Sequence, residues 1–221
     1  MPSFWTETYR EHFQNYFGKP FDVQVFHSAD GDSLKLATHD WARQGFHVFA
    51  SMGLADRLAR AGDAAFGEVI LFSDEPDPEA AKIFVNALFF LLLHDIPLDS
   101  RFAIAFGSLH HAFAQRYGKS ALYFTRPVYE NPAFEEVVGD EGVGRVFQAF
   151  FITPEEDAFL DAKGADAFER EFRTQFAETL SEDERIELAI DMERSHEMQA
   201  RVEELQHQLS RSLSLHRRSC V

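Results

Sequence analysis

Residues 68–93 read EVILFSDEPDPEAAKIFVNALFFLLL, and this stretch indicates an apolar strand followed by a long buried helix. Residues 68–72 predict a strand that is apolar enough to lie in the centre of a sheet. Asp77 is a candidate N-cap, and Pro78 suits the first position of a helix. The most apolar part of the predicted helix, residues 83–93, falls well short of the ~20 residues that a bilayer requires. We therefore expect a buried helix of a globular core.

The same alternation of strands and helices continues on both sides of this stretch. Apolar residues with a period of two predict strands, and a spacing of three or four residues predicts helices. Further strands are predicted at residues 21–26, 34–38, 46–50, 121–125 and 145–152, and further helices at residues 3–17, 154–163 and 165–177. Residues 98–119 show no clear period and predict short strands with irregular loops. Residues 129–144 predict an exposed loop. This pattern indicates an α/β (α+β) fold, with a mixed sheet of about five to six strands and helices packed on it.

Two short segments carry sharp local signals. Thr153, Pro154 and Glu156 stand at the N-cap, first and third positions of a helix, which is a capping box, and Gly164 is the stop of that helix. Met52-Gly53 ends a predicted strand, and Gly53 is expected to adopt a positive φ.

The character of the chain changes after residue 179. Residues 181–218 contain no Gly, Pro or aromatic residue and predict a long C-terminal helix. Its apolar residues alternate at spacings of four and three, as in a short coiled-coil seam: Met198, Val202, Leu205 and Leu209. We expect a domain at residues 1–178 and a helical extension at residues 179–221. The extension either docks on its own domain, in a monomer, or pairs with a second copy, in a homodimer.

The net charge of the chain limits the classes of partner that we expect it to bind. The 221 residues include 21 basic and 37 acidic side chains, a net charge of −16. A surface this acidic disfavours nucleic acids and anionic membranes and suits a basic protein. The single Cys220 cannot form an internal disulfide, and no stretch resembles a signal peptide, so a cytoplasmic location is expected. The candidate partner-binding acids fall in two stretches: Asp74, Glu75 and Asp77 in one, and Glu130, Glu135 and Glu136 in the other.

The order of these segments resembles the suppressor-of-fused domain family, from roughly Tyr9 to Phe176. Residues 47–56, HVFASMGLAD, are similar to the "vTxGmSd" segment of the family at Met52, Gly53 and Asp56, and depart from it at Ala50 and Ser51. The strand at residues 68–72, the helix that follows it, and the segment ALYFTRP at residues 121–127 come in the order of the family. The end of the predicted domain, FFITPEE at residues 150–156 and KGADAF at residues 163–168, resembles the "PlteeE … kGadal" ending.

The resemblance implies a mixed α/β fold and a non-catalytic protein-binding role. In animal members a second domain helps to bind a transcription factor peptide as an added strand, and this chain has only a predicted helix in that place, so that binding mode is not carried over. Bacterial members are proposed to be immunity proteins that neutralise partner toxins, and this chain resembles them in size. No cofactor, metal or catalytic residue is assigned.

Two alternatives stay open. One is a metal-assisted hydrolase that uses some of the ten histidines, among them His39, His94, His110 and His111, although none has the spacing of a helical metal site. For His94 we expect a place at the C-terminal end of its helix. The other alternative is a scaffold protein that assembles through its C-terminal helix.

Overall fold

The computed structural model describes residues 4–29, 31–41, 45–61, 66–127, 132–140 and 142–179. The chain divides into two compact units, Met1–Glu171 and Phe172–Val221. The predicted helix at residues 181–218 and its seam, Met198, Val202, Leu205 and Leu209, lie outside the described residues.

Eight strands form the sheet of the described chain: β1 (Asp22–His27), β2 (Ser33–Trp41), β3 (Phe46–Met52), β4 (Gly67–Ser73), β5 (Phe102–Ala105), β6 (Ala121–Thr125), β7 (Glu136–Gly139) and β8 (Gly142–Ile152). The helices are α1 (Phe4–Phe17), α2 (Leu54–Ala61), α3 (Pro78–Leu93), the 3-10 turn η1 (Leu98–Ser100), α4 (His111–Tyr117), α5 (Pro132–Glu135), α6 (Pro154–Lys163) and α7 (Ala165–Thr179).

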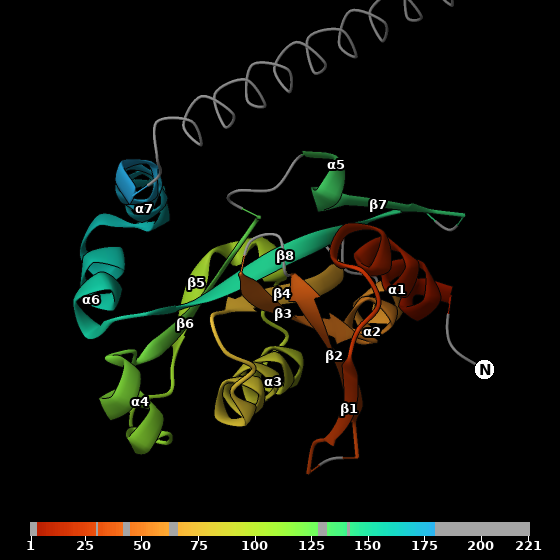
Figure 1. The fold of residues 1–221 in the computed structure, drawn as a ribbon, viewed down its shortest axis with the longest axis horizontal. Helices are drawn as coiled ribbons and strands as arrows, with labels where there is room; N and C mark the ends of the chain where they lie inside the picture. Colours follow the sequence, from red (N-terminus) through yellow and green to blue (C-terminus); the bar gives the residue numbers. More distant parts are fainter. Residues whose placement is uncertain are drawn as a thin grey trace, which may run out of the picture. The chain divides into compact units, whose positions relative to one another are not determined.

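The strands follow the order β1-β2-β3-β4-β8-β6-β5, and β7 pairs with β8 beside this path (Figure 1). Only the pairing of β4 with β8 is parallel, and the other pairings between described strands are antiparallel. The sheet is therefore mixed, as predicted.

The sheet is larger than the predicted five to six strands, because β7 lies in a stretch that predicts an exposed loop, and β5 lies in one that predicts short strands without fixing their positions. Both are only four residues long. Neither stretch shows a sustained alternation, and each strand is held by its partner, β6 or β8. Residues 98–119 also contain the helix α4.

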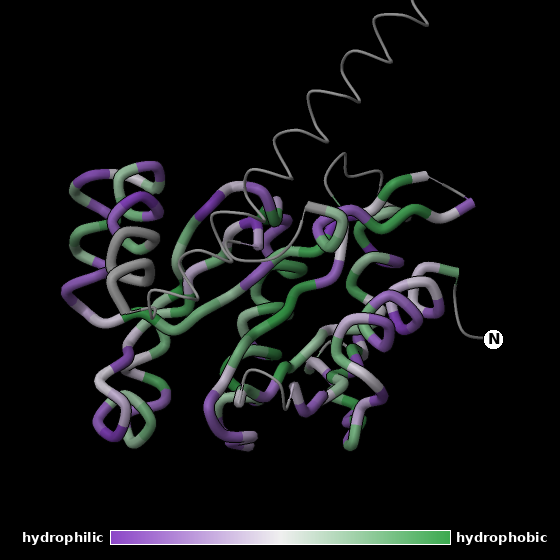
Figure 2. Tube along the Cα trace, turned by 45° about the horizontal axis from the view of Figure 1, so that its top comes forward, coloured by the Kyte–Doolittle hydropathy of each residue, from purple (hydrophilic) through white to green (hydrophobic). Residues whose placement is uncertain are grey.

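The two faces of the sheet bury two separate hydrophobic clusters, because neighbouring residues of a strand point to opposite faces. Phe49 and Leu71 belong to a cluster that packs against α3, whereas Ala50 and Ile70 belong to one that packs against α1 and α5. Figure 2 shows hydrophobic residues along the central strands. No helix of the described residues is both long and apolar enough to cross a membrane.

Candidate functional site

The turn between β3 and α2 contains the segment that resembles the suppressor-of-fused family. Met52 ends β3, Gly53 has a φ of 101°, and α2 begins at Leu54. The positive φ expected for Gly53 is confirmed. Asp56, in the first turn of α2, is buried, with 7% of its surface exposed.

Asp56 holds the first turn of α1. Its carboxylate accepts hydrogen bonds from the backbone N–H of Trp5 at 3.1 Å and of Thr6 at 3.0 Å, and from the Thr6 hydroxyl at 2.5 Å. The two backbone N–H groups are among those that a helix N-terminus leaves without an intrahelical partner. Asp56 therefore joins α1 to α2.

A second carboxylate, that of Glu68 in β4, binds backbone N–H groups at the start of α2 and is fully buried. It accepts hydrogen bonds from the backbone N–H of Gly53 at 2.7 Å and of Ala55 at 3.0 Å, and from the Ser51 hydroxyl at 2.6 Å. Burial raises the pKa of Glu68 to about 7, against the effect of these donors. No described cationic side chain forms an ion pair with it.

Glu68 is absent from the residues that the sequence singles out. The available signal is an acidic residue beside the apolar run Val69–Phe72, a place where an ionised side chain needs partners. Nearby, the hydroxyl of the buried Tyr9 donates to the carbonyl of Arg145 at 2.8 Å. Burial raises the pKa of Tyr9, as does the neighbouring Glu68, so this phenol stays a donor. Each of these groups forms hydrogen bonds that hold the fold together.

The capping box at the start of α6 is confirmed. The backbone N–H of Glu156 donates to the Thr153 hydroxyl at 3.2 Å, and the backbone N–H of Thr153 donates to the Glu156 carboxylate at 2.6 Å. Pro154 is the first residue of α6, and Gly164 is its C-cap.

The first acidic stretch, at the start of α3, is partly used by the fold. Asp77 is the N-cap of α3, accepting from the backbone N–H of Glu79 at 2.7 Å and from the Tyr117 hydroxyl at 2.8 Å. Glu75 lies 3.6 Å from Arg116, and its side chain is 69% exposed. Asp74 is exposed and has no hydrogen bond or ion pair within the described structure.

The described part of the second acidic stretch lies at α5 and the start of β7. Glu135 lies 3.6 Å from Arg126, Glu136 is exposed at the start of β7, and Glu130 lies outside the described residues. The structure therefore does not bring the two stretches together, since α3 packs on one cluster while α5 and β7 pack on the other.

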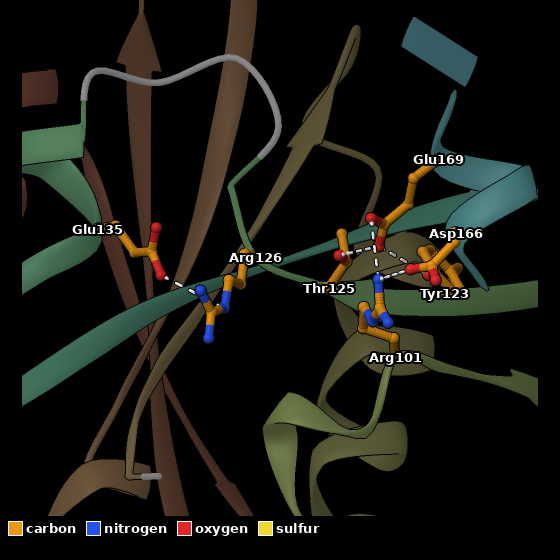
Figure 3. Close-up of polar contacts among 7 residues, drawn as sticks. All are labelled: Arg101, Tyr123, Thr125, Arg126, Glu135, Asp166 and Glu169. Atoms are coloured by element: carbon orange, nitrogen blue, oxygen red, sulfur yellow. Dashed lines mark hydrogen bonds and ion pairs between the residues drawn. The ribbon is translucent and has the colours of Figure 1, made fainter. Parts of the chain in front are cut away.

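A polar cluster on β6 and α7 has no counterpart among the predicted site residues (Figure 3). Glu169 accepts hydrogen bonds from the Tyr123 hydroxyl at 2.9 Å and from the Thr125 hydroxyl at 2.5 Å. Arg101 lies 3.5 Å from the same carboxylate and 2.5 Å from Asp166. Burial and Glu169 raise the pKa of Tyr123, which keeps its hydroxyl as a donor. The cluster attaches the first turns of α7 to the sheet.

The histidines are spread over the structure. His39 is buried, with Nδ1 2.8 Å from the carbonyl oxygen of Gly18, and burial lowers its pKa. His94 is the C-cap of α3, as expected, and His110 Nδ1 lies 2.7 Å from Glu79. Within the described residues, no group of three or more His, Cys, Asp or Glu side chains is placed to hold a metal ion.

The comparisons with known proteins agree with the fold. No family model matches the chain, and no curated protein gives a significant match. The structure is similar to the crystal structure of a protein provisionally assigned as a SUFU (suppressor of fused protein) homolog from Neisseria gonorrhoeae. The TM-score is 0.59 at 15% sequence identity, over 77% of this chain and 90% of that chain. The chain thus has the fold of a bacterial suppressor-of-fused homolog, which confirms at the level of the fold the resemblance seen in its sequence.

Proposed function

We propose that this chain is a non-catalytic domain that binds a basic protein and neutralises it, as an immunity protein neutralises its toxin. The proposal extends the fold likeness to a function. The observation that supports this proposal is the location of the negative charge within the chain. Residues 1–171 contain 27 acidic and 14 basic side chains, so most of the net charge of −16 belongs to the suppressor-of-fused-like unit itself.

The start of α3 is the part of this surface best suited to meet a basic partner. Asp74 has no partner within the described structure, and Glu75 is only loosely paired with an exposed Arg116. Exposed ion pairs of this kind contribute little stability, so these charges are available for association. Asp77 and Glu135 instead serve the fold and its ion pairs, and Glu136 is a separate exposed acid at the start of β7. Acidic surfaces attract basic proteins at rates that fall as salt is added.

The experiment uses the full chain as bait in cells of its own species, at low and high salt, with mass spectrometry of the retained proteins. We expect a basic protein that is retained at low salt and released at high salt. Co-expression of this protein with the chain should relieve any growth defect that it causes. If no basic protein is retained specifically at any salt concentration, the proposal is wrong.

A pair of charge-matched variants then locates the contact. The double variant Asp74→Asn, Glu75→Gln removes two charges at the start of α3, and Glu155→Gln, Asp161→Asn removes two exposed charges from α6. We expect retention to fall at least several-fold for the first variant and much less for the second. Equal losses would mean general electrostatic attraction, and would remove the start of α3 as the contact.

A further inference from the structure

The strand β1 ends the sheet, and its outer edge pairs with none of the described strands (Figure 1). Its sequence, DVQVFH, contains no proline and no lysine, which are two devices that keep exposed edge strands from pairing. Val23 and Val25 are 49% and 53% exposed. They are two residues apart in a strand, so their side chains lie on the same face. Among the described residues nothing pairs with this edge, and an apolar row lies beside it.

We infer that β1 pairs antiparallel with β1 of a second copy of this chain, across a two-fold axis at Gln24. In this register Val23 lies opposite Val25 of the partner subunit, and the two-fold axis repeats the contact. Such an interface is self-complementary, because each apolar residue meets the other one. Cross-strand pairs of β-branched residues stabilise antiparallel pairing.

The position of the axis follows from the alternation of side chains between the two faces of the strand. Residues opposite each other in an antiparallel pair share a face, so the axis must pass through a residue and not between two. An axis at Val25 pairs as many residues of β1 but places Val23 opposite a histidine, His27. An axis at Val23 pairs only three residues of β1. The axis at Gln24 gives the longest ladder in which both valines are covered.

The charges on and around β1 allow this pairing, and they give the dimer a distinct dependence on salt. Asp22 is the only acidic residue of β1. With the axis at Gln24 the two Asp22 side chains are four residues apart along the ladder, about 13 Å, which exceeds the Debye length of about 8 Å at physiological salt. The net charge of each copy still opposes association at low salt. Added salt should therefore strengthen the dimer, whereas it should weaken binding of a basic partner, and the two proposals can fail independently.

The first test is a cross-link in the full chain. Gln24→Cys in a Cys220→Ser background places two cysteines opposite each other at the axis, about 4.5–5.5 Å apart at Cα, which a disulfide can span. Under mild oxidation we expect a covalent dimer. Val138→Cys in the same background is the control, since Val138 is 75% exposed on a strand, β7, outside this interface. Equal cross-linking of both variants, or none at Gln24, would overturn the inference.

The second test measures mass without a cross-link. In sedimentation or light scattering, the mass of the wild-type chain should rise from 25.3 kDa toward twice that value with concentration, and more so at high salt. Val25→Lys should abolish this rise, and Val138→Lys should leave it unchanged, with both variants keeping the wild-type circular dichroism. A dimer that survives Val25→Lys and is lost in Leu205→Asp would assign the contact to the C-terminal segment and overturn the inference. A mass of one chain at every concentration and salt would also overturn it.

Discussion

Ser51 of β3 and Glu68 of β4 are joined by a hydrogen bond of 2.6 Å in a place where both residues are fully buried. The Ser51 oxygen also accepts from the backbone N–H of Val69 at 2.8 Å. The carboxylate is thus held by neutral donors, and it closes α2 without a cation. The ionised form of a carboxylate is less stable in such a buried site than in water. For this reason the pKa of Glu68 is raised.

This arrangement predicts how stability depends on pH. The folded pKa of Glu68, about 7, exceeds its ordinary value of 4.5, so the folded state binds the proton more tightly than the unfolded state. The contribution of Glu68 to stability is full below about pH 4.5 and is lost as the pH rises through 7. Glu68→Gln keeps the shape and cannot ionise. The free energy of unfolding of the variant, relative to wild type, should rise by about 3 kcal/mol or less between pH 5 and pH 8.

The difference between variant and wild type is the quantity to measure, in urea at each pH. Burial lowers the pKa of His12 and His39, and their protonation on acidification acts against stability in both proteins. Glu136→Gln, at an exposed site of β7, is the matched control and should show no such trend. Parallel curves for wild type and Glu68→Gln would contradict the prediction.

Gly53 tests the turn that carries the family resemblance. Its φ of 101° lies in a region that side chains rarely adopt, although the nearest atom to an added Cβ is the Thr6 hydroxyl at 3.8 Å. Gly53→Val should therefore lower the free energy of unfolding by about 1–3 kcal/mol through backbone strain. Denaturant unfolding measures this loss, and a variant as stable as wild type would show that the turn tolerates a β-branched residue.

Gly67, at the start of β4, is constrained by a different cause. A Cβ at this position would lie 1.9 Å from the carbonyl oxygen of Arg145 and 3.0 Å from the Phe147 ring, so the parallel pairing of β4 with β8 has to open. Gly67→Ala should cost about 3 kcal/mol or more. Gly142→Ala is a useful comparison, because that glycine has a φ of 139° and open space around it, so its cost comes from backbone strain alone. Similar losses for the two variants would contradict the steric explanation.

Local signals in the sequence predicted those parts of the fold that depend on neighbouring residues. The N-cap Asp77 and the capping box of Thr153 involve donors within three residues, and both are confirmed. The strand β7 is not predicted and the position of β5 is not fixed, because both strands depend on partners that the sequence order does not reveal.

The polar groups that join the elements were harder to predict for the same reason. Glu169 meets Thr125 across 44 residues, and Glu68 meets Ser51 across 17. Such contacts depend on which strands and helices lie next to one another in the fold, and local sequence patterns do not reveal this. The sequence also groups Asp74 and Asp77 as candidate binding acids, but the structure gives them different roles. Asp77 is the N-cap of α3, whereas Asp74 is exposed.

The two arginines drawn in Figure 3 differ in how deeply their carboxylate partners are buried. Arg101 and Arg126 both face carboxylates, but in different surroundings. Glu169, the shared partner of Arg101, has a side chain only 12% exposed and also holds Tyr123 and Thr125, so removing Arg101 leaves a partly buried carboxylate without its cation. The Arg126 side chain is 56% exposed and lies 3.6 Å from Glu135.

Arg101→Gln should therefore lower the free energy of unfolding by about 1–2 kcal/mol, a figure kept low because the Arg101 side chain is 39% exposed. Arg126→Gln should change it by less than about 0.5 kcal/mol. Urea unfolding at low and high salt separates the two, since added salt screens an exposed pair more than a partly buried one. The double variant Arg101→Gln, Glu169→Gln should recover part of the loss, because the carboxylate left without its cation is then only that of the exposed Asp166. No recovery in that variant would mean that Arg101 acts through Asp166 or its own packing and not through Glu169.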